Sequence, residues 1–363
     1  MLLESELKVM KLELRCLSDR EEIRWDSFVK NCAKGTFFHT TKWKKILESS
    51  FLFESIYLMF EDRRGNLVGV CPFVIKRRFW PFVSFHSLPD SEFGGPLAEG
   101  NYNEVVSYLV PCLKKLAHEK SATYAVIRCS DEKSYGILVR NALMVNRLYG
   151  TMELDLEEKP VDFIWNNVFN KANCQRKYIK RFIRDGFQNR EAKNKEDFKE
   201  FYALYRENMS YIGVPFYPFL FFDNIYNIAF PYNFNIILAK REEKCVGGLG
   251  FFIYGNTIYL ACLGLDRNVP PYYHTSYYLY WGAIEWAQKN GIRYVNFGGT
   301  PSNVNSPYFR LKKKFGTEFR QRYLIYIPLV PKFINEHLLR GIKKLKGILP
   351  ERSIQSLKAS IPN

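Results

Sequence analysis

The hydrophobic positions of this 363-residue chain follow a strand pattern and then a helix pattern, and this succession occurs twice. Residues 55–69 hold a strand rich in β-branched side chains, a charged tight turn and a second strand. Residues 233–247 align with them without gaps, and in both copies the second strand enters through Val-Gly. Two apolar runs separated by a short polar turn are typical of a β-hairpin. The sequence therefore predicts two hairpins of one plan.

The same order of helices and strands surrounds both hairpins. After each hairpin, helix-period apolar positions give way to a short apolar run, which predicts an amphipathic helix followed by a buried strand. Helices also precede each hairpin, and Gly291 stands where the C-cap of a helix is expected. The predicted elements are 25–29, 42–47, 102–120 and 124–128 in the first half, and 197–209, 277–290 and 294–297 in the second. We therefore predict an α/β fold of two tandem units, each a mixed, mostly antiparallel sheet flanked by helices.

The repeat predicts how the chain is divided into two units and a tail. The N-terminal unit is expected over 12–160 and the C-terminal unit over 161–330. Residues 162–186 join them, and Ile179, Phe182 and Ile183 give this segment one apolar face for docking. The tail, 331–363, contains a basic amphipathic helix over 333–349. Such a helix packs on its own protein or lies on an anionic membrane surface.

Composition places the chain among globular proteins with room for two cores. The first residues lack the apolar stretch of a signal peptide, and no run approaches the roughly 18 apolar residues of a membrane-spanning helix. The eight cysteines include no CxxC pair and have no histidine at ligand spacing. We interpret them as reduced thiols, which favours a cytoplasmic protein without a zinc site or a disulfide framework.

The positive charge of the chain is concentrated in three short segments. Lysine and arginine exceed aspartate and glutamate by 53 to 37, a net charge of +16. Residues 171–186, 310–322 and 332–363 carry a net +5 each, since they hold 6, 6 and 7 basic against 1, 1 and 2 acidic residues. Such clusters favour an anionic partner, which is a polynucleotide, a nucleotide-linked metabolite or a membrane surface. A basic surface that serves only solubility is the alternative.

The richest candidate chemistry lies between residues 294 and 316. The predicted strand ends at Gly298-Gly299-Thr300, and a glycine backbone allows close approach because it carries no Cβ. Four cations follow within five residues, ahead of Phe315-Gly316: Arg310, Lys312, Lys313 and Lys314. Cations next to a strand end suit a phosphate or a developing oxyanion. The pattern indicates an acyl-transfer site, although it does not by itself distinguish one cation from the others.

This layout resembles the FemAB-like branch of the GNAT acyltransferase superfamily, and the resemblance spans about 25–327. Residues 308–316, Tyr-Phe-Arg-Leu-Lys-Lys-Lys-Phe-Gly, are similar to the family's Tyr-x-Phe-Lys-x-x-Phe-Gly. Residues 175–181 followed by Gly186 are similar to its arginine-rich helix. Residues 209–218 match a segment of its envelope-associated members, and 38–43 are similar to its Gln-Ser/Thr-x-x-Trp motif.

The resemblance implies tandem GNAT-like domains and an N-acyltransferase. The implied reaction moves an aminoacyl or acyl group from aminoacyl-tRNA or acyl-CoA onto an amine of a cell-envelope or polysaccharide precursor. The acceptor would be nucleotide-linked or lipid-linked, and no tightly bound cofactor is expected. Lys312 falls at the family's catalytic lysine and would stabilise the tetrahedral oxyanion. Three positions depart from the family pattern: Leu311 replaces an aromatic residue, Asn296 replaces an aspartate, and Phe219 replaces a basic residue.

Seven further residues are candidates for substrate binding: Lys44, Arg176, Tyr217, His274, Tyr308, Arg310 and Lys313. His274 either caps the following helix or orients or deprotonates the amine. Tyr217 and Tyr308 either line an acceptor groove or pack, and Lys44 either contacts acceptor phosphates or is solvated. Arg310, Lys313 and Lys314 either hold phosphates or are solvated.

The donor stays open at this level. The loop 266–276, where GNAT enzymes bind the pyrophosphate of acyl-CoA, has no glycine, and its two prolines remove backbone donors. This argues against standard CoA binding. The alternative functions are an acyl-CoA-dependent N-acetyltransferase and a non-catalytic scaffold on RNA or at the inner face of the membrane. The oligomeric state does not follow from the sequence.

Overall fold

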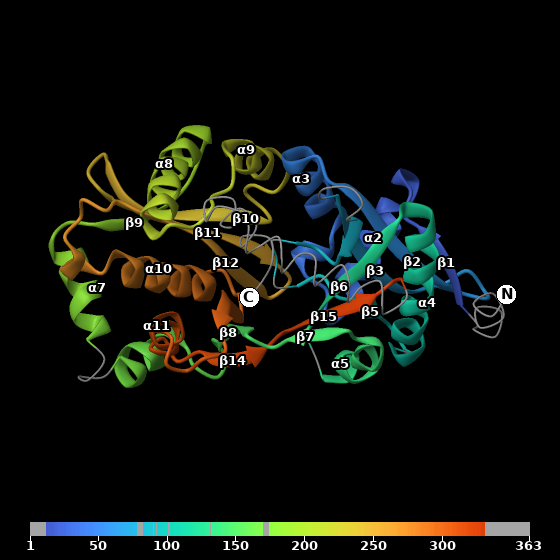
Figure 1. Ribbon diagram of the computed structural model, residues 1–363. Helices are drawn as coiled ribbons and strands as arrows, with labels where there is room; N and C mark the ends of the chain where they lie inside the picture. Colours follow the sequence, from blue (N-terminus) through green and yellow to red (C-terminus); the bar gives the residue numbers. More distant parts are fainter. Residues whose placement is uncertain are drawn as a thin grey trace, which may run out of the picture. The chain divides into compact units, whose positions relative to one another are not determined.

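The described residues divide into two compact units, one within 12–149 with 321–330 and the other within 150–320 (Figure 1). The structure, a computed structural model, describes residues 12–77, 83–89, 91, 93–100, 102–130, 132–169 and 174–330. The predicted tail helix, 333–349, lies outside the described residues. The predicted α/β fold with two mixed sheets is confirmed.

The sheet of the first unit has the strand order β1-β2-β3-β4-β6-β15-β7, with β5 beside β3. Its strands are β1 (Leu12–Cys16), β2 (Glu54–Asp62), β3 (Leu67–Arg77), β4 (Val83–His86), β5 (Leu97–Ala98), β6 (Ala122–Cys129), β7 (Met144–Asn146) and β15 (Tyr323–Pro328). Neighbours are antiparallel except β4 and β6, which are parallel.

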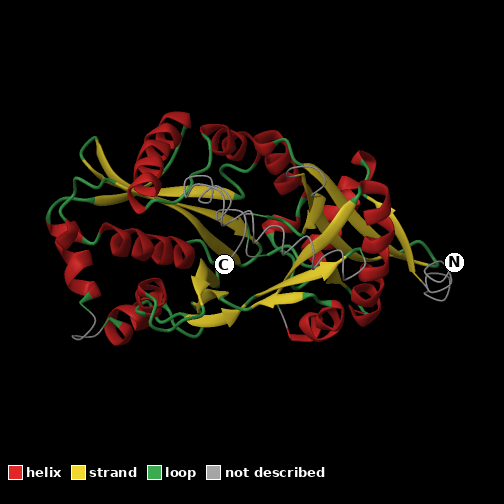
Figure 2. Cartoon of the chain, in the orientation of Figure 1, coloured by secondary structure: helices red, strands yellow, loops and turns green. Residues whose placement is uncertain are grey.

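Helices cover both faces of this first sheet (Figure 2). They are α2 (Glu22–Asn31), α3 (Thr41–Phe51), α4 (Tyr102–Lys120) and α5 (Glu132–Leu138). Helix α4 buries Val106, Leu109 and Leu113 at helical spacing, and each such side chain contributes about 1.5–3 kcal/mol of burial free energy. Helix α3 begins after Thr40, whose hydroxyl accepts from the backbone N–H of Trp43.

The sheet of the second unit has the order β14-β8-β13-β12-β11-β10-β9. Its strands are β8 (Tyr149–Asp155), β9 (Gln188–Glu191), β10 (Phe234–Arg241), β11 (Lys244–Tyr254), β12 (Thr257–Leu265), β13 (Tyr294–Pro301) and β14 (Glu318–Gln321). Strands β9 to β12 form an antiparallel series, whereas β12 and β13 are parallel.

Two long helices lie on opposite faces of this second sheet. A Cβ at Gly247 would meet α10 (Thr275–Lys289) through Thr275, 2.9 Å away. A Cβ at the next residue, Gly248, would instead meet α8 (Lys195–Ile212) through Phe201, 2.5 Å away. Successive residues of a strand point to opposite faces, so glycines let both helices pack closely on β11. The remaining helical segments are α6 (Val161–Phe163), η4 (Ile164–Val168), α7 (Gln175–Arg184), α9 (Phe219–Ile228), η5 (Pro271–Tyr273) and α11 (Pro307–Lys313).

The predicted repeat is present, with β2–β3, α4 and β6 in the first unit matching β10–β11, α10 and β13 in the second. The unit boundaries differ from the predicted 12–160 and 161–330 because two strands lie in the sheet of the other half. Strand β8 lies beside β13, and β15 lies beside β6. A local alternation pattern marks a strand but carries no information on its distant partner.

The predicted docking face of residues 162–186 is only partly correct. Ile179 and Phe182 are fully buried, but Ile183 is 56% exposed. The buried face of α7 continues at Gln175 instead, which is also fully buried. One turn of helix has 3.6 residues, so Ile183 lies at the side of the face that 175, 179 and 182 share.

His39 is buried in the first unit. Its Nδ1 accepts from the hydroxyl of Thr36 at 2.8 Å, and its Nε2 donates to the backbone oxygen of Gly95 at 3.1 Å. Burial lowers the pKa of His39 to about 4, because protonation would place a charge where water cannot reach it. The neutral imidazole therefore belongs to the folded state.

This burial predicts an acid-labile first unit. In the unfolded chain His39 takes up a proton near pH 6.5, but in the folded chain only near pH 4. The unfolding free energy should therefore fall by roughly 3 kcal/mol as the pH drops from 6.5 to 4. Denaturant unfolding across this range should show the slope in the wild type and lose it in His39→Gln. The control is His118→Gln, on the exposed side of α4; an unchanged slope in His39→Gln would contradict the assignment.

Candidate functional site

The two parallel strands of the second unit separate toward their C-terminal ends. The pairing joins Thr257–Tyr259 to Tyr294–Asn296, although β12 extends to Leu265 and β13 to Pro301. In the pairing of β12 with β11, Gly250 opposes Cys262 and Phe251 opposes Leu260, so the ladder skips Ala261, which is exposed. Such a bulge leaves backbone polar groups outside the ladder. Backbone groups of β12 are therefore presented where the two strands diverge.

Gly298 brings β13 close to Leu260 of β12, just beyond the last paired residues Tyr259 and Asn296. Its φ is +70°, and a Cβ there would lie 2.8 Å from the backbone oxygen of Leu260. The buried Asn296 supports the turn, because its Oδ1 accepts from the N–H of Gly298 at 2.9 Å. A side chain at 298 would meet both a backbone clash and an unfavourable φ. Gly298, one of the two glycines predicted to permit a close approach, thus approaches the neighbouring strand.

Lys312 lies against the end of β13. It belongs to α11, its side chain is only 7% exposed, and its ammonium has three acceptors within hydrogen-bond range. Nζ lies 2.7 Å from the oxygen of Gly299, 3.0 Å from Oγ1 of Thr300 and 3.3 Å from the oxygen of Gly298. An ammonium carries three N–H groups, so these contacts match its donor capacity. The contacts fix a positive charge beside the diverging strands.

Phe315 explains the Phe-Gly pair of the motif. Its fully buried ring is surrounded by four aromatic rings with centroids 5.5–5.6 Å away: Phe169, Tyr277, Tyr280 and Phe297. Gly316, at φ +82°, then turns the chain away. These contacts anchor the C-terminal end of α11 to α10 and β13, and so hold Lys312 in place.

The other three cations of the motif turn in different directions. Arg310 donates to Oδ1 of Asn305 at 2.9 Å, and Lys313 donates to the backbone oxygen of Thr317 at 2.9 Å. Lys314 lies 3.4 Å from the hydroxyl of Tyr277, at the first turn of α10. The four cations of residues 310–314 therefore do not form one cationic centre. Of the contacts described for these four side chains, those with the end of β13 all belong to Lys312.

A second positive cluster surrounds the N-terminus of α10. His274 holds the N-cap position at φ +52°, but its ring makes no capping hydrogen bond and instead packs on Tyr178, with centroids 4.0 Å apart. Arg181 of α7 donates to the backbone oxygen of Tyr272 at 2.7 Å. Burial, followed by the charges of Lys314 and Arg181, lowers the pKa of His274. Two fixed cations at a helix N-terminus favour an anionic group there.

The remaining candidates lie apart from these two groups. Tyr308 is 59% exposed on α11, and Arg176 is half-buried on α7. Tyr217 packs on Phe221 with centroids 4.5 Å apart. Lys44 belongs to the first unit, where its ammonium pairs with Glu48 one helical turn away, at 2.8 Å. Their proposed roles in substrate binding stay predictions.

Sequence reasoning missed Thr300 as a partner of Lys312 and the positions of Arg181 and Lys314 near His274. The sequence could have indicated Arg181, because it lies in the basic helix of the motif at residues 175–181. For Thr300, the sequence offers only its position directly after two glycines.

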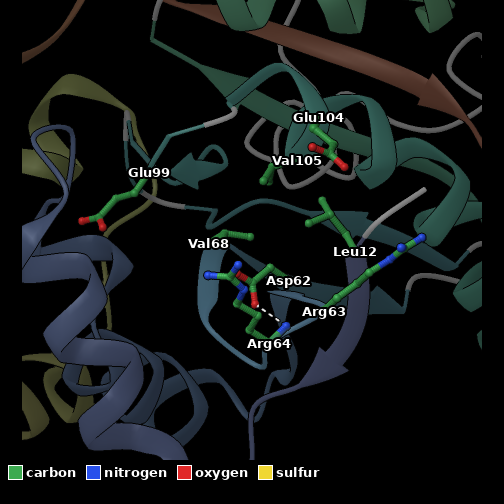
Figure 3. Close-up of a pocket in the computed structure, with 8 residues that line it drawn as sticks. All are labelled: Leu12, Asp62, Arg63, Arg64, Val68, Glu99, Glu104 and Val105. Atoms are coloured by element: carbon green, nitrogen blue, oxygen red, sulfur yellow. Dashed lines mark hydrogen bonds between the residues drawn. The ribbon is translucent and has the colours of Figure 1, made fainter.

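The first unit has a separate hollow of about 290 Å³ near the β2–β3 turn (Figure 3). Its walls are apolar at Leu12, Val68 and Val105, whereas its rim carries both signs of charge, with Arg63 and Arg64 against Asp62, Glu99 and Glu104. Asp62 is engaged in the turn itself, because its Oδ1 accepts from the N–H of Arg64 at 2.8 Å. This mixed rim indicates no particular ligand.

Comparison with known proteins finds a similar family within the second unit. Residues 173–310 match the family model described as an acetyltransferase (GNAT) domain. A search of curated protein sequences finds no match.

Solved structures show the same fold over most of the chain. FemX is 15% identical with a TM-score of 0.67, covering 86% of this chain and 96% of its own. L-PGS from Bacillus licheniformis is 13% identical with a TM-score of 0.58, covering 87% and 95%. A tandem GNAT protein from the clavulanic acid biosynthesis pathway is 10% identical with a TM-score of 0.55, covering 88% and 99%. The resemblance and the tandem GNAT-like fold predicted from the motifs are confirmed.

None of the helices in the described part of the chain has both the length and the apolar character needed to cross a bilayer. Nor do His, Cys, Asp or Glu side chains of the described residues gather in groups of three or more that would suit a metal ion.

The close approach of β12 and β13 predicts a large cost for a side chain at 298. Gly298→Ala should lower the unfolding free energy by about 2–4 kcal/mol, because it adds a backbone clash to the strain of a positive φ. Gly291→Ala is the matched control, since φ is +69° there and nothing lies within 4 Å of the added Cβ. Chemical denaturation of both variants measures the difference. Equal losses would show that β12 does not constrain residue 298.

Proposed function

We propose that the protein is an N-acyltransferase, from the premise that residues 173–310 match the model of an acetyltransferase (GNAT) domain. It transfers an acyl or aminoacyl group onto an amine of a cell-envelope or polysaccharide precursor. One observation carries the proposal: the buried ammonium of Lys312 is held at the end of β13, where β13 diverges from β12. The FemX-like fold of the chain supports it.

The chemistry requires a neutral amine, an acyl carbonyl and stabilisation of a tetrahedral oxyanion. The amine nitrogen attacks the carbonyl carbon, the carbon–oxygen π electrons move onto the oxygen, and collapse of the intermediate expels the donor with a proton. The bulge at Ala261 presents backbone groups that can orient the carbonyl. Holding both reactants between diverging strands supplies the entropic part of the rate enhancement.

Lys312 acts in this proposal mainly through its fixed charge. Its three N–H groups already face Gly298, Gly299 and Thr300, so direct donation to the oxyanion requires the release of one of them. The 3.3 Å contact with Gly298 is the longest and therefore the one that yields most easily. A charge fixed in advance stabilises the transition state without reorganising.

The cluster at α10 is the proposed site for phosphates of the donor. Arg181 and Lys314 flank the helix N-terminus, and the lowered pKa of His274 keeps its imidazole neutral near pH 7. Acyl-CoA and aminoacyl-tRNA both carry phosphates. The description of the matching domain as an acetyltransferase favours acyl-CoA, and the loop 266–276 without glycine favours a donor held differently from standard CoA.

The role of Lys312 predicts a selective loss of turnover. Lys312→Gln should lower kcat about 100-fold with little change in KM, because its charge acts in the transition state. Lys313→Gln, at the next residue, removes an exposed ammonium that donates to the backbone oxygen of Thr317. The kcat of this variant should stay within about twofold of the wild-type value. Transfer from acetyl-CoA and from charged tRNA to amino-bearing envelope precursors measures both variants. Equal, mild losses would remove Lys312 from the mechanism.

The phosphate site predicts weaker donor binding when its cations are neutralised. Arg181→Gln and Lys314→Gln should each weaken binding of the donor about tenfold, since each removes one charge-assisted contact. Lys289→Gln, at the opposite end of α10, is the control. Titration calorimetry with CoA and with tRNA distinguishes the donors. Wild-type affinity in both Arg181→Gln and Lys314→Gln would place the phosphates elsewhere.

A further inference from the structure

The connection between α8 and α9, whose path Figure 1 shows, exposes a run of large apolar side chains. We define the apolar loop as residues 211–220. Five of its side chains are each at least 40% exposed: Tyr211, Ile212, Val214, Phe216 and Leu220. Residues 208–222 contain no charged side chain. A contiguous apolar surface of this kind on a folded protein marks an interaction site.

The apolar loop is held in place from both sides. Helix α8 ends at Gly213, at φ +72°, and Nδ2 of Asn208 binds the backbone oxygen of Leu263 in β12 at 2.8 Å. On the other side, the N–H of Tyr217 lies 3.4 Å from the hydroxyl of Tyr205, and Pro218 precedes α9. The apolar side chains are thus displayed outward on a supported loop.

A cation lies beside this loop. The guanidinium of Arg267 lies 4.3 Å from the ring centre of Tyr211 and also binds Oδ1 of Asn208. Apolar and aromatic side chains bordered by arginine match the two layers of a lipid surface, with acyl chains inside and phosphates outside.

We propose that the apolar loop inserts into the surface of an anionic lipid bilayer, with Arg267 facing the lipid phosphates. The aliphatic side chains favour lipid over RNA, because Ile212, Val214 and Leu220 have no ring on which a base can stack. The guanidinium group of Arg267 favours an anionic surface over a second copy of this loop, since two copies would bring like charges together. The proposal does not depend on the reaction that the site performs.

Vesicle binding by the full-length chain tests the proposal. Sedimentation with phosphatidylcholine vesicles that contain phosphatidylglycerol should retain the protein, and the binding should weaken without phosphatidylglycerol and at high salt. The double variant Phe216→Ser/Leu220→Ser should lower the partition coefficient at least about tenfold. Tyr232→Ser, an exposed side chain beyond the other end of α9, is the matched control and should bind as the wild type. The tail, 331–363, is the same in all variants.

Several outcomes would overturn the proposal. One is equal vesicle binding by the wild type and the double variant, and another is no binding by the wild type. A dimer, or a complex with RNA, that the double variant loses while vesicle binding persists would assign the loop to that partner instead. Both substituted side chains are exposed, so an unchanged melting temperature is expected. Transfer to a soluble acceptor without vesicles separates the two proposals, because loop variants should leave it unchanged.

Discussion

The geometry of the site depends on one buried ammonium ion bound to the end of a strand. Removing a charged lysine from water costs several kcal/mol unless hydrogen bonds replace the lost solvation. Two backbone oxygens and the hydroxyl of Thr300 provide that replacement for Lys312. The backbone oxygens of Gly298 and Gly299 face the ammonium of Lys312 at a turn in which Gly298 adopts a φ of +70°. Lys312 and Gly298 therefore form one structural unit, which Phe315 secures from the far end of α11.

The contact of Lys312 with β13 also provides hydrogen-bond partners for backbone groups that two diverging strands leave unpaired. When two strands part, their facing backbone groups lose the partners that a continuous ladder would supply, and each needs another. Lys312 serves the carbonyl groups on the β13 side. On the β12 side, the bulge at Ala261 presents backbone groups that the proposed function assigns to the acyl donor. The protein itself thus supplies hydrogen-bond partners for the backbone of β13. For the backbone of β12, the proposed partner is the substrate.

Local patterns predicted most of the elements of this fold. The predicted helix 102–120 coincides with α4, and the hairpins at 55–69 and 233–247 were found from alternation and turn residues alone. Ile183 was assigned to the buried face because a list of apolar residues does not show the edge of a helical face. The sheets that receive β8 and β15 were not predicted, since pairing between distant strands leaves no local trace.

The candidate site was predicted less completely than the fold. Lysines 312, 313 and 314 are chemically identical in sequence, but successive helical side chains point about 100° apart, so only one faces β13. The family motif selected Lys312, and the burial of its side chain agrees with that choice. The neighbours of His274 come from α7 and from the end of α11, which approach each other only in the folded chain.

The position of β15 has a consequence for how the protein is made. Tyr323 pairs with Cys129, which lies 194 residues earlier (323 minus 129), and β15 separates β6 from β7. During synthesis the first sheet must therefore wait, with an open edge at β6, until the ribosome has produced the whole of the second unit. An open edge is prone to pair with foreign strands, and distant pairing slows folding. Neither half is a module that a simple cut would release, and loss of the last described strand would damage the first unit.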